Sequence, residues 1–265
     1  MDGLAESLRL MAGGRLRRLL TRFTDNRVMG AITGAGTTAI IQSSSVTTVL
    51  VVGFVSAGVM TLSQAIGVIL GANVGTTITA QIVAFKVTDY ALGAVALGFF
   101  LQFVAKTPAK KARGQALLGL GLVFFGMSLM GDAMRPLREY EPFVDLMIAM
   151  ENPIVGIAIG AGFTALVQSS SATTSIVIVL AAEGLIGLEA GIALVLGANV
   201  GTSVTALLAA IGKPRLALRA AYVHSLFNVL GVVLWLPFLG LLATWTSALS
   251  DDTAREIANA HTIFN

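Results

Sequence analysis

The sequence contains no cysteine and few charged residues. The absence of cysteine excludes disulfides, thiol nucleophiles and thiolate metal sites. Only 12% of the 265 residues are charged, whereas soluble domains have about a quarter. Residues 28–85 include no Asp, Glu, Lys or Arg at all. With 55% hydrophobic residues and a mean hydropathy of +0.85, the composition predicts an integral membrane protein.

The charge-free stretch is far longer than the roughly 20 residues that one spanning helix needs, so we expect several crossings or re-entrant segments within it. Further apolar helices are expected near residues 90–105, 114–130 and 221–245. The predicted fold is therefore all-α and polytopic, with broken or re-entrant helical hairpins.

Basic residues occur in short clusters between the apolar segments, within residues 1–27, 106–113 and 213–219. Short clusters of this kind indicate membrane loops and argue against a nucleic-acid partner. The positive-inside rule places these segments in the cytoplasm and the mixed, acidic stretch 132–151 outside. We expect a multi-pass protein of the bacterial inner (plasma) membrane with a cytoplasmic, amphipathic N-terminal segment at 1–27.

Two motifs occur twice at the same offset of 126 positions: Gln42 begins a Gln-Ser-Ser-Ser run that returns at Gln168, and Gly71 begins a Gly-Ala-Asn-Val-Gly-Thr run that returns at Gly197. About half of the positions in 34–80 are identical in the second copy, which marks an internal repeat. Because the first copy is expected to begin inside and the second outside, the sequence predicts an inverted-topology repeat. The expected parts are repeat 1 (28–113), a connecting helix and external loop (114–152), repeat 2 (153–245), and a loop with the start of a final helix that the sequence cuts short (246–265).

The first motif places hydroxyls and one amide in strongly apolar sequence. Such groups are costly in a membrane unless they are satisfied, which favours a ligand site over the alternative of hydrogen-bonded helix packing. Gly58 and Gly184, at matching places after the motifs, are expected to end the hairpins. The candidate ligand-binding residues of this motif are Gln42, Ser43, Ser44, Ser45, Thr47, Thr48, Gln168, Ser169, Ser170, Ser171, Thr173 and Thr174.

The second motif allows two interpretations. Gly67, Gly71 and Gly75 fall four apart, a spacing that predicts close helix packing. The motif lacks the Lys of a phosphate-binding P-loop. Its polar side chains are candidates either for ligand binding or for interhelical hydrogen bonds. These candidates are Asn73, Thr76, Asn199 and Thr202.

Neither motif contains Arg or Lys. An oxyanion bound there would meet only dipoles, and burying a multiply charged anion without a counter-charge is very unfavourable. A co-bound cation on the same oxygens would resolve this, so the residues predict symport of a cation and an anion. Proton coupling is less favoured because proton relays use intramembrane acids or His. Glu183 and Glu189 lie near a predicted turn and are interpreted as a solvated rim.

His224 and Asn228 lie four apart and therefore on one helix face, where we assign them a supporting role. The same His-x-x-Phe-Asn pattern returns at residues 261–265.

These features together resemble the type II sodium-phosphate cotransporters, over roughly residues 28–265. The resemblance implies that the two Gln-Ser-Ser-Ser stretches form a joint sodium and phosphate site, with Na⁺ as the co-transported ion. It nominates Gln42, Ser44, Thr48, Gln168, Ser170 and Thr174 as Na⁺ ligands. Some members of that family carry an acid at the position of Ser225, so ion stoichiometry stays open here.

The functional hypothesis is sodium-coupled symport of inorganic phosphate across the plasma membrane by alternating access. Open alternatives are a carrier of another oxyanion, a phosphate exporter and a membrane phosphate sensor that transports nothing. An intramembrane serine hydrolase is disfavoured because no Gly-x-Ser-x-Gly elbow is present at either motif, so no catalytic residues are assigned. The expected partners are phosphate, sodium and the lipid bilayer, and association with a further copy of the chain is left open.

Overall fold

The computed structural model describes residues 26–85 and 90–265, which form helices joined by turns, without a strand. All but two residues of the predicted N-terminal segment 1–27 lie outside the described part. In chain order the elements are α2 (Arg27–Ile41), α3 (Ser44–Ser56), α4 (Leu62–Val83), α5 (Ala91–Val104), α6 (Pro108–Met134), the 3₁₀ turn η2 (Arg135–Glu139), α7 (Glu141–Ala149), α8 (Pro153–Val167), α9 (Ser170–Ala182), α10 (Leu188–Ala210), α11 (Arg215–Trp235), the 3₁₀ turn η3 (Leu236–Phe238), α12 (Leu239–Ser247) and α13 (Thr253–Phe264).

The helices of the two sequence copies begin and end at equivalent residues. α8 and α9 repeat the bounds of α2 and α3 at the offset of 126, and α10 starts where that offset places the start of α4. Both short pairs are followed by a glycine with positive φ, Gly58 at 68° and Gly184 at 67°. The predicted hairpin ends are therefore confirmed as left-handed turn positions, where glycine carries little steric cost.

Glycines bring α2 into backbone contact with α4. A Cβ atom added at Gly34 would lie 2.2 Å from the carbonyl oxygen of Val68, and one added at Gly71 would lie 1.8 Å from that of Ala31. The second repeat packs α8 on α10 in the same way: the oxygens met are those of Leu194 at Gly160 (2.1 Å), Ile157 at Gly197 (2.1 Å) and Ala161 at Gly201 (2.3 Å). The prediction that these glycines serve close helix packing is confirmed.

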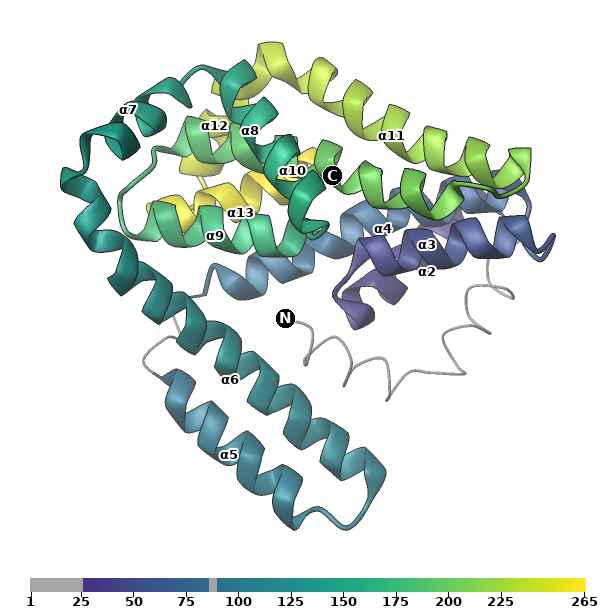
Figure 1. The fold of residues 1–265 in the computed structure, drawn as a ribbon, viewed down its shortest axis with the longest axis horizontal. Coiled ribbons are helices and arrows are strands. Elements are labelled where there is room, and N and C mark those ends of the chain that lie inside the picture. Colours follow the sequence, from purple (N-terminus) through teal and green to yellow (C-terminus); the bar gives the residue numbers. More distant parts are fainter. Residues whose placement is uncertain (1–25, 86–89) are drawn as a thin grey trace.

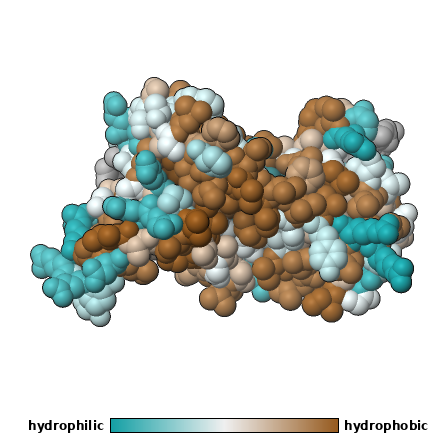
Figure 2. Space-filling model, turned by 90° about the horizontal axis from the view of Figure 1, so that it is seen from above, coloured by the Kyte–Doolittle hydropathy of each residue, from teal (hydrophilic) through white to brown (hydrophobic). Residues whose placement is uncertain are grey.

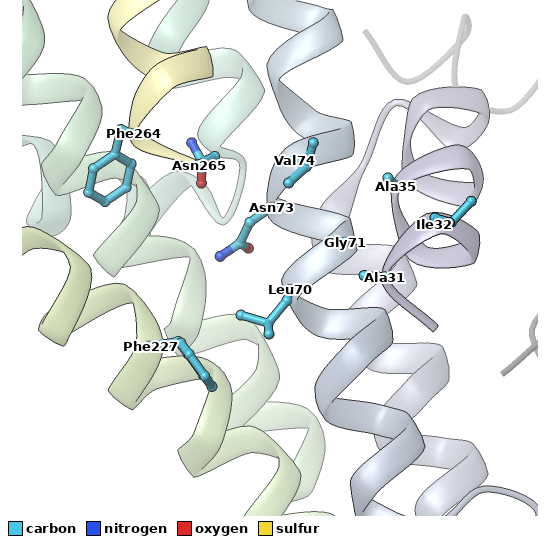
Figure 3. A pocket seen from close by; sticks show the side chains of 10 residues that line it. All are labelled: Ala31, Ile32, Ala35, Leu70, Gly71, Asn73, Val74, Phe227, Phe264 and Asn265. Atoms are coloured by element: carbon cyan, nitrogen blue, oxygen red, sulfur yellow. The ribbon is translucent and has the colours of Figure 1, made fainter. Parts of the chain in front are cut away.

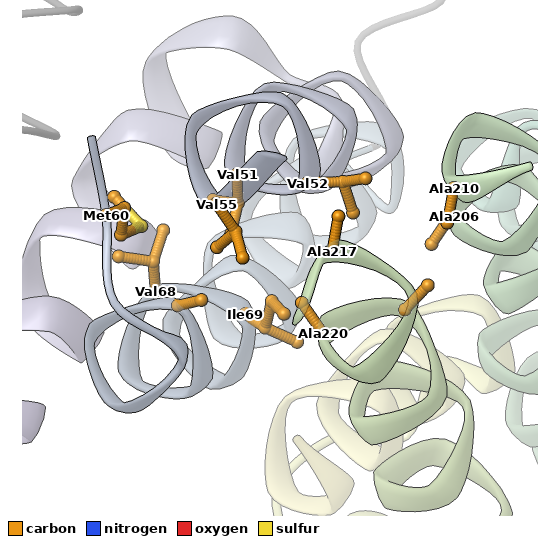
Figure 4. Packing of buried hydrophobic residues seen from close by; sticks show 12 residues of the cluster. Val51, Val52, Val55, Met60, Val68, Ile69, Ala206, Ala210, Ala217 and Ala220 are labelled. Carbon is orange, nitrogen blue, oxygen red and sulfur yellow. The ribbon is translucent and has the colours of Figure 1, made fainter. Parts of the chain in front are cut away.

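In each repeat the two short helices form a hairpin, and the second of them packs back toward the start of the long helix that follows it in the chain. α2 runs parallel to α4, and Gln42 at its end lies beside Thr79 near the end of α4. α3 then comes back, because Val55 belongs to one core cluster with Ala65 and Val68 in the first half of α4 (Figure 4). In the second repeat α9 returns likewise, and its last turns pack near the start of α10. These are the broken hairpins that the sequence predicts.

The repeats interlock through reciprocal contacts. The second half of α3 packs on the end of α10, through Val51 and Val52 against Ala206 and Ala210. The second half of α9 packs on the end of α4, where Ile178 meets a cluster of Ala80, Val83 and Ala84. Since each hairpin returns to the start of its own long helix and contacts the end of the other, α4 and α10 run in opposite directions. In Figure 1, α3 and α9 extend in opposite directions from the middle of the body.

α5 and α6 form an arm that projects from this body (Figure 1). Gly98, Gly114 and Gly121 allow the two helices to touch, since a Cβ at each would meet backbone of the other helix within 2.9 Å. The rest of α5 is largely exposed and apolar; Phe103 is 81% exposed. Figure 2 shows a broad apolar surface across the visible face, with hydrophilic residues gathered toward its left and right ends. Such a surface suits a lipid environment.

Four helices of the described residues are long and apolar enough to cross a membrane, or five if one bent pair counts as a single span. They are 62–83, 108–139, 188–210 and 215–247, and the bent pair joins α7 and α8 at 110°. The protein is thus a multi-pass helical membrane protein. The helix expected at 114–130 begins earlier, at Pro108, and the one expected at 221–245 contains the turn η3. Pro237 accounts for that turn, because proline lacks the N–H that a continuous helix requires.

Candidate functional site

The Gln-Ser-Ser-Ser motif is a break between two helices. Gln42 ends α2 in the left-handed conformation, with φ of 59°, and Ser43 then caps α3 by accepting a hydrogen bond from Val46 N at 3.4 Å. Gln168 does the same at the end of α8, with φ of 57°, and Ser169 caps α9 through Ala172 N at 3.2 Å. A left-handed residue other than glycine costs roughly 1–2 kcal/mol. Both copies therefore carry the same strained residue at the same place.

The break brings opposite helix ends together. The carbonyls that end α2 carry partial negative charge, and the free N–H groups that begin α3 carry partial positive charge. Ser44 and Ser170, the first residues of α3 and α9, are 5% and 4% exposed. Each break therefore offers acceptors for a cation beside donors for an anion.

One threonine of each motif forms hydrogen bonds that close the break. Thr38 in α2 donates to Thr47 in α3 at 2.9 Å, and Thr47 donates to Ser43 O at 3.3 Å. Thr164 and Thr173 repeat the pair at 2.7 Å, and Thr173 donates to Ser169 O at 3.2 Å. Sequence reasoning missed Thr38 and Thr164. The signal available was that both stand four residues before the motif in each copy.

The next threonine of each motif has no partner. The hydroxyls of Thr48 and Thr174 are buried, with the residues 1% and 3% exposed, and neither makes a hydrogen bond within the described residues. A buried hydroxyl without a partner costs about 1–3 kcal/mol. Two such hydroxyls, at equivalent positions, can coordinate a cation through the lone pairs of their oxygens. Hydroxyl and carbonyl oxygens are the donors that hard cations take.

The two glutamines differ. The side-chain oxygen of Gln42 accepts from Thr79 at 2.8 Å, and its amide nitrogen donates to Ala39 O. Gln168 is exposed, and its side chain makes no hydrogen bond in the described part. Thr205, which is equivalent to Thr79, has a buried hydroxyl without a partner there. The second break is thus the less satisfied of the two.

The asparagines of the second motif make interhelical hydrogen bonds. Asn73 donates to the side-chain oxygen of Asn228 at 2.8 Å, and Asn228 in turn donates to the backbone oxygen of Asn199 at 2.8 Å and to Ser203 at 3.1 Å. Asn228, on α11, therefore joins α4 of the first repeat to α10 of the second. Thr76 and Thr202 donate to backbone oxygens one turn earlier in their own helices, at 3.0 and 2.9 Å.

Both copies of the pattern His-x-x-Phe-Asn join the asparagine network. His224 lies 3.1 Å from Asn228, while Asn265 accepts from Asn199 at 3.1 Å and His261 lies 3.3 Å from Asn199. Both histidines are 1% exposed. His261 and Asn265 were recognised as a repeated pattern but not named as site residues. The repeated letters were the signal that would have found them.

A pocket of about 500 Å³ opens beside this network. Asn73 and Leu70 extend from α4 toward Phe227, Phe264 and Asn265 (Figure 3). Most of its lining is apolar. The lining includes Asn73 and Asn265 but none of the serines of the first motif.

Charged groups lie away from the breaks. Arg135 and Arg138 bind the carboxylate of Glu183 at 3.5 and 3.4 Å, and Arg138 also donates to the backbone oxygen of Glu183 at the end of α9. The side chain of Glu183 is 23% exposed. Glu183 is therefore an ion-paired cap that ties the second hairpin to η2, rather than only a solvated rim. Glu189 is exposed.

The fold is that of a multi-pass helical membrane protein in which the same helix break occurs twice. The sequence profile of the Na⁺/Pi-cotransporter family matches residues 1–132 and 144–264. The chain belongs to this family, which is a family of transporters and not of enzymes. No solved structure shows significant similarity to the chain.

Individual relatives agree. The chain is 36% identical to "Uncharacterized protein YqeW" of Bacillus subtilis over 100% of the chain and 86% of that protein. It is 31% identical to "Putative inorganic phosphate export protein YjbB" of Escherichia coli over 96% of the chain and 47% of that protein, so it spans about half of that relative's length. It is 34% identical to human "Sodium-dependent phosphate transport protein 2B" over 135 residues, 47% of the chain and 20% of that protein.

Proposed function

We propose that the protein carries inorganic phosphate across the bacterial plasma membrane together with Na⁺, by alternating access. One observation carries the proposal: both repeats of this cotransporter-family chain hold the same helix break with the same unpartnered, buried threonine hydroxyl, at Thr48 and Thr174.

Sodium would bind at the breaks. The oxygens available are the hydroxyls of Thr48 and Thr174, the first serines of α3 and α9 (Ser44 and Ser170), and the glutamine side chains. Broken helices in secondary transporters commonly hold Na⁺ through freed carbonyls at their ends. Because Thr47 and Thr173 already close the break, we assign the cation to their neighbours Thr48 and Thr174.

Phosphate would bind at the starts of α3 and α9. A helix N-terminus carries roughly half a positive charge, so two of them supply about one. Neither motif contains Arg or Lys, so a phosphate dianion leaves about one negative charge to be balanced. At least one Na⁺ at the neighbouring oxygens would balance it. The two substrates are then coupled by the balance of their charges rather than by a moving gate.

Alternating access follows from the opposed repeats. α4 and α10 run in opposite directions, and the two hairpins open toward opposite ends of the body. With a cytoplasmic N-terminus, this arrangement supports an inverted-topology repeat, and the proposal requires its two breaks to face one central site. Rocking of one repeat against the other would then expose that site to each side in turn.

The direct test is radiolabelled phosphate flux in proteoliposomes. An inward Na⁺ gradient should drive uptake, and replacing Na⁺ by K⁺ should abolish it. Because one relative is named as a phosphate export protein, phosphate-loaded vesicles should be measured in the same way for efflux. Flux that follows a proton gradient and ignores Na⁺ would overturn sodium coupling, and competition by sulfate or arsenate would define the anion.

A matched pair of variants tests the cation ligands. Thr48→Val removes the hydroxyl with little change in shape, and Thr48→Ser keeps it. Because the hydroxyl has no partner among the described residues, we expect Thr48→Val to be at least as stable as wild type. We also expect its half-saturating Na⁺ concentration to rise by about tenfold or more, the usual worth of a contact to a charge. Thr48→Ser should stay near wild type. An unchanged Na⁺ dependence in Thr48→Val and in Thr174→Val would remove both from the site.

A further inference from the structure

A basic groove lies at the tip of the α5–α6 arm, away from the helix breaks. Its volume is about 430 Å³. One wall comes from the last turns of α5 and is apolar, through Phe100, Leu101 and Val104. The other wall comes from the connecting loop and the start of α6, with Lys106, Lys110 and Arg113. An apolar wall thus faces three cations across one hollow.

The cations of this groove have no anionic partner in the part of the chain that the structure describes. Residues 90–131 contain no Asp or Glu, so the arm carries only positive charge up to Asp132. The side chains of Lys106, Lys110 and Arg113 make no ion pair or hydrogen bond with any described residue. Three unpaired, exposed cations in 8 residues repel one another, and a bound anion would relieve that repulsion.

The start of α6 adds to the positive potential. Thr107 caps the helix by accepting from Lys110 N at 3.4 Å, and Pro108 stands in its first turn. The positive end of this 27-residue helix therefore points into the region of the three cations. The helix end alone would not define a site, but here it coincides with the groove and its charges.

The length of α5 favours a position of the groove near a membrane surface. α5 has 14 residues, which is about 21 Å of helix against a hydrocarbon core of about 30 Å. A helix this short draws its flanking cations toward the headgroup layer, where lysine and arginine extend along their apolar stems. The exposed face of α5 then lies among acyl chains.

We propose that this groove binds one anionic phospholipid. The phosphodiester lies among Lys106, Lys110 and Arg113, and an acyl chain lies along Phe100, Leu101 and Val104. Charge complementarity selects an anionic headgroup, and the apolar wall selects a lipid over a free anion. Because the arm projects from the body, the lipid anchors the arm in the bilayer and is not cargo (Figure 1).

Native mass spectrometry of the detergent-solubilised protein tests the proposal, with phosphatidylglycerol, phosphatidylcholine of the same chains, and soluble glycerol phosphate as probes. We expect one tightly retained phosphatidylglycerol. Lys110→Gln should weaken its binding about fivefold, the usual effect of one cation near an anionic headgroup. The control is Lys111→Gln, because Lys111 carries the same charge one residue away and does not line the groove.

Each result decides the matter. Preferential retention of phosphatidylglycerol that is weakened in Lys110→Gln and in Arg113→Gln but unchanged in Lys111→Gln supports the proposal. Equal loss in Lys111→Gln would show diffuse attraction without a site and would overturn it. Equal retention of phosphatidylcholine, or equal binding of glycerol phosphate, would also overturn it. Sodium-driven phosphate flux is a separate readout, so failure here leaves the transport proposal standing.

Discussion

Gln168 offers a test in which stability and transport move in opposite directions. Its backbone is left-handed, with φ of 57°, a conformation that glycine adopts with little strain. Its side chain is exposed and makes no hydrogen bond within the described residues. A sequence selected for stability alone would therefore carry glycine here, as most left-handed helix caps do. Strained residues that persist without a local structural reason are candidates for function.

The expected magnitude follows from the backbone. Gln168→Gly relieves roughly 1–2 kcal/mol of left-handed strain, and glycine gives back about 0.4–1 kcal/mol through the entropy of the unfolded chain. The net gain is between about 0 and 1.6 kcal/mol, and the centres of the two ranges give about 0.8 kcal/mol, which raises the midpoint of thermal unfolding by about 2–3 °C for a chain of this size. If the amide binds sodium or phosphate, transport should fall at least about tenfold in the same variant.

Two further substitutions separate the causes. Gln168→Ala removes the amide but keeps the strain, so it should lose transport like Gln168→Gly without the gain in stability. Gly184→Ala is the reverse control: its φ is 67° and no atom lies within 4 Å of the added Cβ, so only backbone strain changes. It should lose up to about 1.6 kcal/mol, because the lower entropy of the unfolded chain offsets part of the added strain. Thermal unfolding in detergent and sodium-driven uptake are the assays. Wild-type transport in Gln168→Gly would refute the functional argument, and destabilisation there would refute the strain argument.

Two other predictions concern packing. Gly34→Ala should destabilise the protein by about 1–3 kcal/mol, as overpacking does, because the new methyl meets Val68 O at 2.2 Å. Gly36→Ala, two residues away with nothing within 4 Å, should be neutral or stabilising, and equal thermal stability of the two variants would contradict the close packing of α2 on α4. Asn228→Leu should cost about 2–4 kcal/mol, because it leaves buried groups of Asn73, Asn199 and Ser203 unpaired. Ser225→Ala, which removes only a bond to Ala221 O in the same helix, is its control, and an Asn228→Leu protein that unfolds at the wild-type temperature would remove the bridge between repeats.

Much of the architecture can be predicted from the amino-acid sequence. The charge-free run and the repeated polar motifs predict a membrane protein of two repeats with broken hairpins. The structure confirms the helical class and places a break at each Gln-Ser-Ser-Ser run. The repeat offset even carries over to helix bounds, because capping by serine and a left-handed cap at glutamine are local properties of the chain. The helix expected at 114–130 begins earlier because Thr107 caps it and Pro108 stands in its first turn, and the helix expected at 221–245 is interrupted by the 3₁₀ turn at Pro237.

The roles of neighbouring hydroxyls could not be read in this way. Thr47 and Thr48 are adjacent and identical in type, yet one is held by Thr38 while the other has no partner among the described residues. Successive residues of a helix point about 100° apart, so only the packed neighbours decide which of them is satisfied. The same holds for Asn73 and Asn199, whose partners Asn228 and Asn265 are brought to them by α11 and α13.

By itself the sequence determined that this is a membrane protein, that it is built twice, and where each copy breaks its helix, because hydrophobicity, repetition and capping are carried by local stretches of chain. Only the tertiary structure decided that Asn228 joins α4 to α10, and that the hydroxyls of Thr48 and Thr174 have no partner among the described residues. Those facts depend on which helix faces meet, and contacts between residues far apart in the chain leave no local pattern to read.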